Sequence, residues 1–402
     1  MAEARKHIVV LGAGFAGASA ARSLPAGEAQ VTLIDRSEEY AFAPLIHEVA
    51  AGRVHPGSIV SSIPRLCRAA RCEFAQAEVE SVDLAGRLLH AGGRIFHYDY
   101  LILAPGTVPV PPPEDLRKHF TLFGTLDDAL ELRRQLSESW KRAQRGSGEP
   151  GLLTVAIVGG GTTGVELAFE LGSLFEHLRR RSRRSLQARI LLLEATDRLM
   201  GWLDPYFHEV ALRRLKEVGI EVRLNAPVEE SHPEAVRAGE EWIPARIKVW
   251  AAGVSAPPLV RDLPAGRDDL GRVRVDGHLT LPAHPEVYVI GDAAAYEDRR
   301  YGILPPTASV AVQQGPYAAR DIRQRLRGGR RTPFRYLNRG YIVSTGPESA
   351  IAEVSGRRFE GRAAQALYRS VFLYYMDRRE RLLTTADWAM DAALGRLGFA
   401  SP

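Results

Sequence analysis

The sequence predicts an α/β protein with two parallel-sheet units, because two stretches share the same strand, glycine-turn and helix pattern. The first is residues 7–17, HIVVLGAGFAG, and the second is residues 155–166, VAIVGGGTTGVE. In each stretch apolar strand residues precede three glycines at G-x-G-x-x-G spacing, namely Gly12, Gly14 and Gly17, then Gly159, Gly161 and Gly164. One such motif is weak evidence, but two in this context indicate two Rossmann-like dinucleotide-binding domains.

The chemistry of nucleotide binding explains the glycine spacing. One glycine permits the tight turn, the next lets the backbone approach a pyrophosphate, and the last lets helix and strand pack closely. The anion then lies on the unpaired N–H groups of the helix N-terminus. In each unit a second strand ends in an acid, Asp35 or Glu194. A carboxylate there accepts hydrogen bonds from a ribose hydroxyl and repels a 2′-phosphate, so Glu194 favours NAD over NADP.

Bulk composition restricts the class of partner and the expected location. The 402-residue chain has a net charge of +5, which suits an anionic cofactor or membrane surface and does not indicate nucleic acid. Four residues separate Cys67 and Cys72, so they form neither a C-x-x-C redox pair nor a metal knuckle, and no metal is expected. No signal peptide fits, and no apolar run approaches the roughly 18–20 residues of a spanning helix. We expect a cytoplasmic protein, or a peripheral one on the cytoplasmic membrane face.

Further elements bring polar groups to strand and helix ends. Residues 287–295, VYVIGDAAA, form a strand that delivers Gly291 and Asp292 to a helix start. Asp292 can bind a polyol hydroxyl of a cofactor, and it can also act as a helix N-cap. A helix with Thr307 as its N-cap follows, and Pro316 should kink or end it. His47 and its neighbour Glu48 lie in an apolar segment that predicts a short core helix.

The tail differs in character from the rest of the chain. Residues 362–399 predict an amphipathic helix pair, with arginines interspersed and with Trp388 placed where it could lie at a water–lipid boundary. A tail that packs on the body of the protein or on a second subunit explains the same pattern. The apolar positions are Leu367, Val371, Phe372 and Tyr375, then Ala386, Ala389, Met390, Ala393, Leu394 and Leu397.

Taken together, the motifs resemble those of type II NADH dehydrogenases, the single-chain NADH:quinone oxidoreductases of the two-dinucleotide-binding-domain flavoproteins. The resemblance covers most of the chain. It rests on GAGFAG (12–17), FAPLIHEVA (42–50), APGT (104–107), VGGGTTGVELA (158–168), WAAGV (250–254), GDAA (291–294) and PPTA (305–308). The glycine motifs and GDAA occur across the superfamily, whereas PLIHEVA, GVELA and WAAGV are more specific.

The resemblance implies FAD as a bound cofactor, NADH as a substrate and particular site residues. Glu166 resembles the family's glutamate near the nicotinamide–flavin contact, and Gln313 resembles the second glutamine of the quinone-site signature A-Q-x-x-x-Q. The first glutamine of that signature is Ser309 here. The implied catalytic set is Glu166, Ser309 and Gln313. The implied cofactor-binding set is Gly12, Gly14, Gly17, Asp35, Gly106, Gly291, Asp292 and Ala308, with Gly159, Gly161, Gly164, Glu194 and Gly253.

The expected organisation is a discontinuous FAD domain, residues 1–113 and 255–330, with an inserted NADH domain, residues 114–254. Residues 331–402 would form a membrane-association or dimerisation region, so an anionic membrane surface and a homodimer are the expected partners besides quinone. The implied reaction passes hydride from NADH to FAD and two electrons to a membrane quinone without proton pumping. The alternatives are a soluble NADH-dependent reductase of a ferredoxin- or rubredoxin-type acceptor, or a slow flavin redox sensor.

Overall fold

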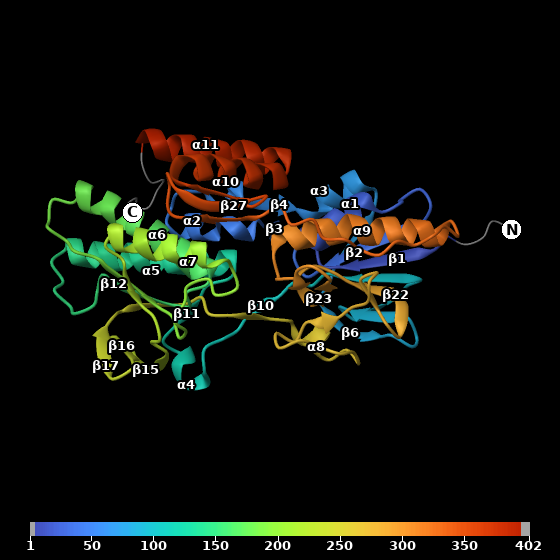
Figure 1. The fold of residues 1–402 in the computed structure, drawn as a ribbon, viewed down its shortest axis with the longest axis horizontal. Coiled ribbons are helices and arrows are strands. Elements are labelled where there is room, and N and C mark those ends of the chain that lie inside the picture. The colour runs from blue at the N-terminus through green and yellow to red at the C-terminus, as the bar shows by residue number, and fades with distance from the viewer. Residues whose placement is uncertain (1–4, 395–402) are drawn as a thin grey trace. The chain divides into compact units, whose positions relative to one another are not determined.

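A computed structural model describes residues 5–394 (Figure 1). The chain divides into two compact units, one of residues 1–40, 61–108 and 254–339, the other of residues 41–60, 109–253 and 340–402. Each unit holds one of the two glycine motifs, and the predicted α/β class with two Rossmann-like domains is confirmed. Residues 41–60 belong to the second unit, although the sequence analysis grouped them with the first glycine motif. They do so because the short helix α2, Ile46–Ala50, packs on helices of the second unit.

The first unit is built on a six-stranded sheet with the order β21-β22-β9-β1-β2-β5. All neighbouring strands are parallel except β21 and β22. Their bounds are β21 Thr280–Leu281, β22 His284–Val289, β9 Tyr100–Leu103, β1 His7–Leu11, β2 Gln30–Asp35 and β5 Glu73–Gln76. The strands at the centre, β1 and β9, are almost entirely buried, as expected for a parallel sheet that is covered on both faces.

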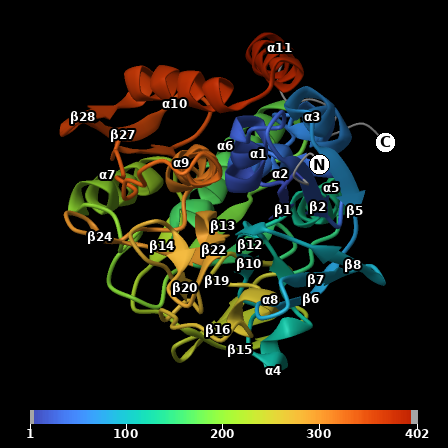
Figure 2. The ribbon, with the colours of Figure 1, turned by 90° about the vertical axis from the view of Figure 1, so that its right-hand side faces the viewer.

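Two cores cover the two faces of this sheet. On one face helices α1, Phe15–Ser23, α3, Ile63–Ala70, and α9, Ala308–Leu326, pack together, and α1 lies along α9 (Figure 2). On the other face lies an antiparallel meander with the short helix α8, Pro258–Arg261. The meander consists of β6 Val79–Asp83, β7 Leu88–Ala91 and β8 Arg94–His97. Helix α9 continues through Pro316, so the helix does not end there, and the kink that was expected as the alternative stays a prediction.

The second unit repeats this plan. Its parallel sheet has the order β11-β18-β12-β13-β14, and an antiparallel meander, β15-β16-β17, packs on one face. The bounds are β11 Thr121–Leu122, β18 Ile247–Trp250, β12 Thr154–Val158, β13 Arg189–Leu193, β14 Glu221–Arg223, β15 Val228–His232, β16 Ala235–Ala238 and β17 Glu241–Pro244. The helices are α4 Glu114–Arg117, α5 Leu126–Gln144, α6 Thr162–Arg181 and α7 Pro205–Glu217. Helix α5 begins at a capping box formed by Thr125 and Asp128.

The C-terminal segment adds a third layer to the second unit. It comprises a small antiparallel sheet, β26 Tyr341–Ser344, β27 Ala350–Val354 and β28 Arg357–Glu360, and two helices. These are α10, Gly361–Tyr375, and α11, Arg378–Leu394. Figure 1 shows both helices in red beside α2 and α6, on the side of the unit opposite β15–β17. Within residues 5–394 no helix combines the length and the apolar character needed to cross a bilayer.

The glycine turns have the same steric basis in both units. A Cβ at Gly17 would lie 1.8 Å from the carbonyl oxygen of Gly12, and one at Gly164 would lie 1.9 Å from that of Gly159. The helix can therefore approach the turn only where no side chain exists. In contrast, a Cβ at Gly14 or Gly161 would meet no atom within 4 Å, which leaves open space beside the middle glycine.

This difference predicts opposite effects for two neighbouring substitutions. Gly164→Ala forces α6 away from the turn and should destabilise the second unit by about 2–3 kcal/mol. Gly161→Ala should leave the melting temperature nearly unchanged, because its methyl group enters open space. Thermal unfolding followed by circular dichroism measures both. Equal melting temperatures for the two variants would contradict the packing role of Gly164.

Candidate active site

In the first unit an acid closes the glycine turn. The backbone N–H of Ala13 donates to Asp35 Oδ2 at 2.8 Å, and the N–H of Ser37 donates to Oδ1 at 3.0 Å. Gly12 adopts a φ of +90°, which favours glycine. The carboxylate at the end of β2 is thus held against the turn that follows β1, where the sequence placed it.

The second unit has the same arrangement with a longer acid. The N–H of Gly160 donates to Glu194 Oε2 at 2.6 Å, and the backbone N–H of Thr196 donates to Oε1 at 2.8 Å. Gly159, with a φ of +112°, makes the turn, and Gly161 is the N-cap of α6. We call each glycine turn with its acid a cradle: Gly12, Gly14 and Asp35 form the first, and Gly159, Gly161 and Glu194 form the second. Both cradles present open backbone N–H groups at a helix start and a carboxylate at the adjacent strand end.

The remaining predicted cofactor positions of the first unit lie around α1 and the start of α9. Gly291 has a φ of +68°, and a Cβ there would come within 2.8 Å of the Ala16 side chain. Burial raises the pKa of its neighbour Asp292 to about 6. Helix α9 starts at Ala308, as expected, but the hydroxyl of its N-cap Thr307 makes no capping hydrogen bond.

Polar atoms without partners mark this region as suitable for a bound group. Several buried polar atoms of the described residues have no hydrogen-bond partner, and two of these donors lie here: Thr307 Oγ1 and Gln314 Nε2. The other amide atom of Gln314, Oε1, accepts from the Gly291 N–H at 2.6 Å. A ligand rich in hydroxyl, phosphate and carbonyl oxygens would satisfy these donors, and the residues present therefore fit a dinucleotide.

Ser309 and Gln313 lie one turn apart on α9, but their side chains differ in how many hydrogen bonds they already make. Gln313 Nε2 donates to the carbonyl groups of Ser309 and Leu337, and Oε1 accepts from the Leu337 N–H. Its amide is thus committed to backbone groups. The Ser309 hydroxyl lies 3.5 Å from the Tyr336 hydroxyl. Gly106 and Gly253 lie three residues after the ends of β9 and β18, at positive φ values of +72° and +80°.

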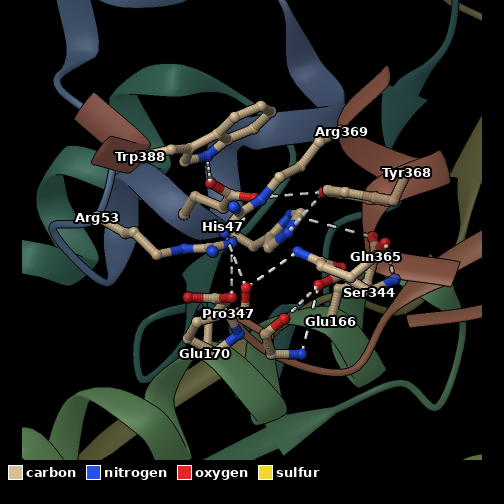
Figure 3. Close-up of polar contacts among 12 residues, drawn as sticks. His47, Arg53, Glu166, Glu170, Ser344, Pro347, Gln365, Tyr368, Arg369 and Trp388 are labelled. Atoms are coloured by element: carbon tan, nitrogen blue, oxygen red, sulfur yellow. Dashed lines mark hydrogen bonds and ion pairs between the residues drawn. The ribbon is translucent and has the colours of Figure 1, made fainter. Parts of the chain in front are cut away.

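Glu166, the third predicted catalytic residue, lies in the second unit on α6. Its Oε1 accepts from the Ser344 N–H at 3.0 Å, and its Oε2 lies 4.0 Å from His47 Nδ1 (Figure 3). Burial, opposed by the Ser344 N–H and assisted by the nearby acids Glu48 and Glu170, raises the pKa of Glu166 to about 8. Glu166 is therefore a carboxyl group that exchanges its proton close to neutral pH.

A chain of polar contacts continues from Glu166 into the protein. His47 Nε2 lies 3.3 Å from the Tyr368 hydroxyl, and that hydroxyl donates to Glu48 Oε1 at 3.4 Å. Trp388 then donates its indole N–H to Glu48 Oε2 at 2.6 Å. Burial lowers the pKa of His47 to about 4 and raises that of Glu48 to about 7. The imidazole is thus neutral at physiological pH.

One cation neutralises part of this group of acids. The Arg53 guanidinium is fully buried and lies 2.5 Å from Glu48 Oε1 and 3.0 Å from Glu170 Oε1. Figure 3 shows His47, Glu166, Glu170, Tyr368 and Trp388 converging on this region from α2, α6, α10 and α11. We call the set of His47, Glu48, Arg53, Glu166, Glu170, Tyr368 and Trp388 the buried charge cluster.

Helix α11 packs with the opposite polarity to that expected of an amphipathic helix. Its buried positions are Glu380, Thr384, Asp387 and Trp388, whereas Leu382 and Met390 are 64% and 39% exposed. Trp388 is only 5% exposed, so the expectation that it lies at a water–lipid boundary is wrong. Its indole instead donates to a buried carboxylate. Leu397 lies outside the described residues.

Sequence reasoning singled out His47, Glu48 and Glu166 of the buried charge cluster and expected Trp388 at a membrane boundary. It gave the other three members, Arg53, Glu170 and Tyr368, no role. An arginine directly after an apolar segment that already holds a histidine and a glutamate could have indicated a buried ion pair. Among the described residues no group of three or more His, Cys, Asp or Glu side chains is placed to hold a metal ion.

Comparison with known proteins places this geometry in a family. Residues 6–315 match the family model of the pyridine nucleotide-disulphide oxidoreductases. The type II NADH:quinone oxidoreductase of Mycobacterium tuberculosis is 31% identical over 98% of this chain and 89% of its own length. This chain belongs to the type II NADH:quinone oxidoreductase family.

Other relatives of this family agree over nearly the full length. Demethylphylloquinone reductase of Synechocystis is 28% identical over 96% of both chains. Among solved structures, NDH2 of Plasmodium falciparum in complex with NADH has a TM-score of 0.89 at 17% identity, and it covers 98% of this chain and 99% of that one. The sulfide:quinone oxidoreductase of Aquifex aeolicus has a TM-score of 0.78 at 18% identity, over 97% and 96%. These structures share the fold.

The raised pKa of Glu166 predicts a pH-dependent stability. A carboxyl group whose pKa is 4.5 when unfolded and about 8 when folded contributes stability below pH 4.5 that is lost as the pH rises through 8. Glu166→Gln cannot ionise, and it can still accept from the Ser344 N–H. From pH 5 to pH 9 the free energy of unfolding should therefore fall in the parent protein by about 2–4 kcal/mol more than it does in the variant.

Glu176→Gln, on the same helix, is the matched control. The Arg179 and Arg180 side chains lower the pKa of Glu176 to about 2, so it stays ionised throughout this pH range. Chemical denaturation at several pH values measures all three proteins. The same pH dependence in Glu166→Gln and the parent protein would contradict the assignment.

Proposed function

We propose that this protein is an FAD-dependent oxidoreductase that transfers hydride from NADH to FAD and two electrons onward to a membrane quinone, without pumping protons. The observation that carries the proposal is the pairing of two acid-closed glycine cradles with a buried, neutral-range carboxyl group, in a chain of the type II NADH:quinone oxidoreductase family. The fold and the glycine motifs are suited to binding FAD and NADH. The buried charge cluster is suited to quinone reduction, a reaction that consumes protons.

The two cradles would hold the cofactors through different acids. Asp35, the turn of Gly12 and Gly14, and Asp292 would hold FAD, with the orphaned donors of Thr307 and Gln314 beside them. When bound, FAD supplies an acceptor for hydride and a donor of electrons to quinone. Glu194 and the turn of Gly159 and Gly161 would hold NADH, and the negative charge of Glu194 would disfavour NADPH.

Glu166 is suited to supply a proton to a reduced quinone. A proton donor works best when its pKa lies near the working pH, and burial brings the pKa of Glu166 to about 8. His47 and Tyr368 connect it to Glu48, whose pKa is about 7. We assign Glu166 as the proton donor and this chain of groups as the route that refills it.

The predicted acceptor residues Ser309 and Gln313 take separate roles in this proposal. The amide of Gln313 is committed to Ser309 and Leu337, so it shapes the acceptor site by holding the backbone at Leu337. The Ser309 hydroxyl lies beside Tyr336, and the resemblance to the quinone-site signature implies a glutamine at this position. This replacement would change the contacts offered to the quinone ring and hence the preferred quinone.

The outer face of α11 supports peripheral attachment to a membrane. Leu382, Leu383 and Met390 are exposed, and Ala386, Ala389 and Ala393 share their face at helical spacing. Because the inner face of α11 already carries the contacts to the protein, the apolar face is left for lipid. We therefore propose that the C-terminal region, whose described residues 340–394 pack within the second unit, mediates membrane association and that the protein acts on the cytoplasmic membrane face. A homodimer through the same face is the alternative use of this surface.

Anaerobic spectroscopy tests the proposed function. The purified protein should be yellow from FAD, NADH should bleach the flavin, and a short-chain quinone should restore its colour. Bleaching without re-oxidation by quinone, but with re-oxidation by a ferredoxin- or rubredoxin-type protein, would favour the soluble reductase. A flavin that bleaches only over many minutes would favour a redox sensor.

Glu166→Gln separates the two half-reactions. The variant should bind FAD and should bleach with NADH at the parental rate, because the half-reaction with NADH needs no proton from Glu166. Quinone-dependent turnover should fall by about tenfold to a hundredfold, since general acid catalysis contributes at least this much. Stopped-flow absorbance measures both half-reactions, and Glu176→Gln again serves as the control. Parental turnover in Glu166→Gln would remove the assigned role.

Charge on the outer face of α11 should weaken membrane binding. A Leu382→Glu, Met390→Glu double variant replaces two exposed apolar side chains of this face, and it should bind anionic vesicles at least about tenfold more weakly. Val218→Glu is the control, because Val218 is similarly exposed, at 56%, but lies at the end of α7. Sedimentation with vesicles provides the measurement. Equal binding by all three proteins would show that α11 does not face lipid.

A further inference from the structure

The inner face of α11 makes specific polar contacts with the second unit. Thr384 Oγ1 donates to the Ser58 carbonyl group at 3.1 Å, and Asp387 accepts from the His55 N–H at 2.8 Å. Trp388 donates to Glu48 at 2.6 Å. The first two contacts hold the helix against the turn at residues 55–58. The third differs from them, because its partner is an ionisable side chain of the buried charge cluster.

Glu48 is fully buried, and its two oxygen atoms have different partners. Oε1 lies 2.5 Å from Arg53 and accepts from the Tyr368 hydroxyl, whereas Oε2 accepts from the Trp388 indole. The titratable and charged groups that face Glu48 are His47 of α2, Arg53, Glu166 and Glu170 of α6, and Tyr368 and Arg369 of α10, with Asp391 of α11 near Arg53. Among the described residues, Trp388 is the donor that reaches Oε2.

The indole is itself held in place. The Arg369 guanidinium lies 5.2 Å from the centre of the Trp388 ring, and Arg369 also donates to the Pro347 carbonyl group at 2.9 Å (Figure 3). Trp388 therefore presents its N–H from a fixed position. A donor fixed against a buried carboxyl oxygen stabilises the ionised form more than the protonated form, because the ionised oxygen is the stronger acceptor.

We propose that Trp388 is a positioning residue for proton transfer, because its indole N–H keeps Glu48 able to release a proton to the buried charge cluster. The proposal rests on the proposed function, since Glu48 is there the group that refills Glu166 through Tyr368 and His47. Burial alone would hold the proton on Glu48 at neutral pH. The indole counteracts burial, as does Arg53, and α11 is the element that supplies it.

Infrared titration of the full-length, FAD-loaded protein tests the proposal without turnover. The carbonyl stretching band of a protonated carboxyl group is followed from about pH 5 to 10, and Glu48→Gln identifies the component that belongs to Glu48. In Trp388→Phe, which keeps a buried ring but lacks the donor, this component should titrate about one to two pH units higher than in the parent protein.

Thr384→Val is the matched control, because it removes a buried contact of the same helix that does not involve Glu48. The Glu48 component should titrate there as in the parent protein. A parental titration in Trp388→Phe, or an equal displacement in Thr384→Val, would overturn the proposal. Should Trp388→Phe fail to fold, 3-benzothienylalanine at position 388 keeps the bicyclic shape without the N–H and is held to the same outcomes.

Turnover distinguishes this proposal from the function on which it rests. If both hold, quinone-dependent turnover of Trp388→Phe is depressed at neutral pH and recovers at higher pH, whereas Thr384→Val keeps the parental pH profile. An infrared displacement with a parental pH profile supports the effect of Trp388 on Glu48 and removes Glu48 from the proton route. A parent protein that does not reduce quinone at all removes the proposed function but leaves the infrared result interpretable.

Discussion

The ion pairs of Arg53 with Glu48 and Glu170 are the interaction on which the second unit depends most. All three side chains are fully buried, and a charge that is removed from water must regain its stabilisation from partners inside the protein. One guanidinium faces two carboxylates, with Glu166 close by. Burial is the main cause of the raised pKa values of Glu48 and Glu166, and repulsion between the neighbouring acids adds to it, so protons remain on some of these acids near neutral pH.

This constraint explains the reversed polarity of α11. A buried carboxylate needs donors, and the tail supplies the Trp388 indole and the Tyr368 hydroxyl to Glu48. The face of α11 that carries Thr384, Asp387 and Trp388 must therefore turn inward. Once it does, helical geometry puts Leu382 and Met390 on the outside, where they contribute nothing to the core. The same requirement thus buries the cluster and exposes the apolar face.

The local parts of the fold were predictable from the sequence, because short-range sterics determine them. At Gly17 and Gly164 only glycine fits, so the pattern of glycines identifies both turns, and the acids at Asp35 and Glu194 follow from the lengths of strand and helix. The buried charge cluster was not predictable in the same way. Tyr368 lies 321 residues from His47, and Trp388 lies 340 residues from Glu48, so no local pattern links them.

The misjudged position of Trp388 shows where periodicity arguments fail. Helical spacing correctly groups Ala386, Met390 and Ala393 on one face, but spacing does not say whether that face points inward or outward. The choice depends on what the neighbouring elements require. An apolar partner would bury the alanines and the methionine, whereas the partner of α11 is a segment with a buried carboxylate at Glu48 and backbone groups at His55 and Ser58. Leaving buried polar groups without hydrogen-bond partners costs more free energy than burying the apolar side chains would gain. The polar face of α11 is therefore the one that packs against the protein.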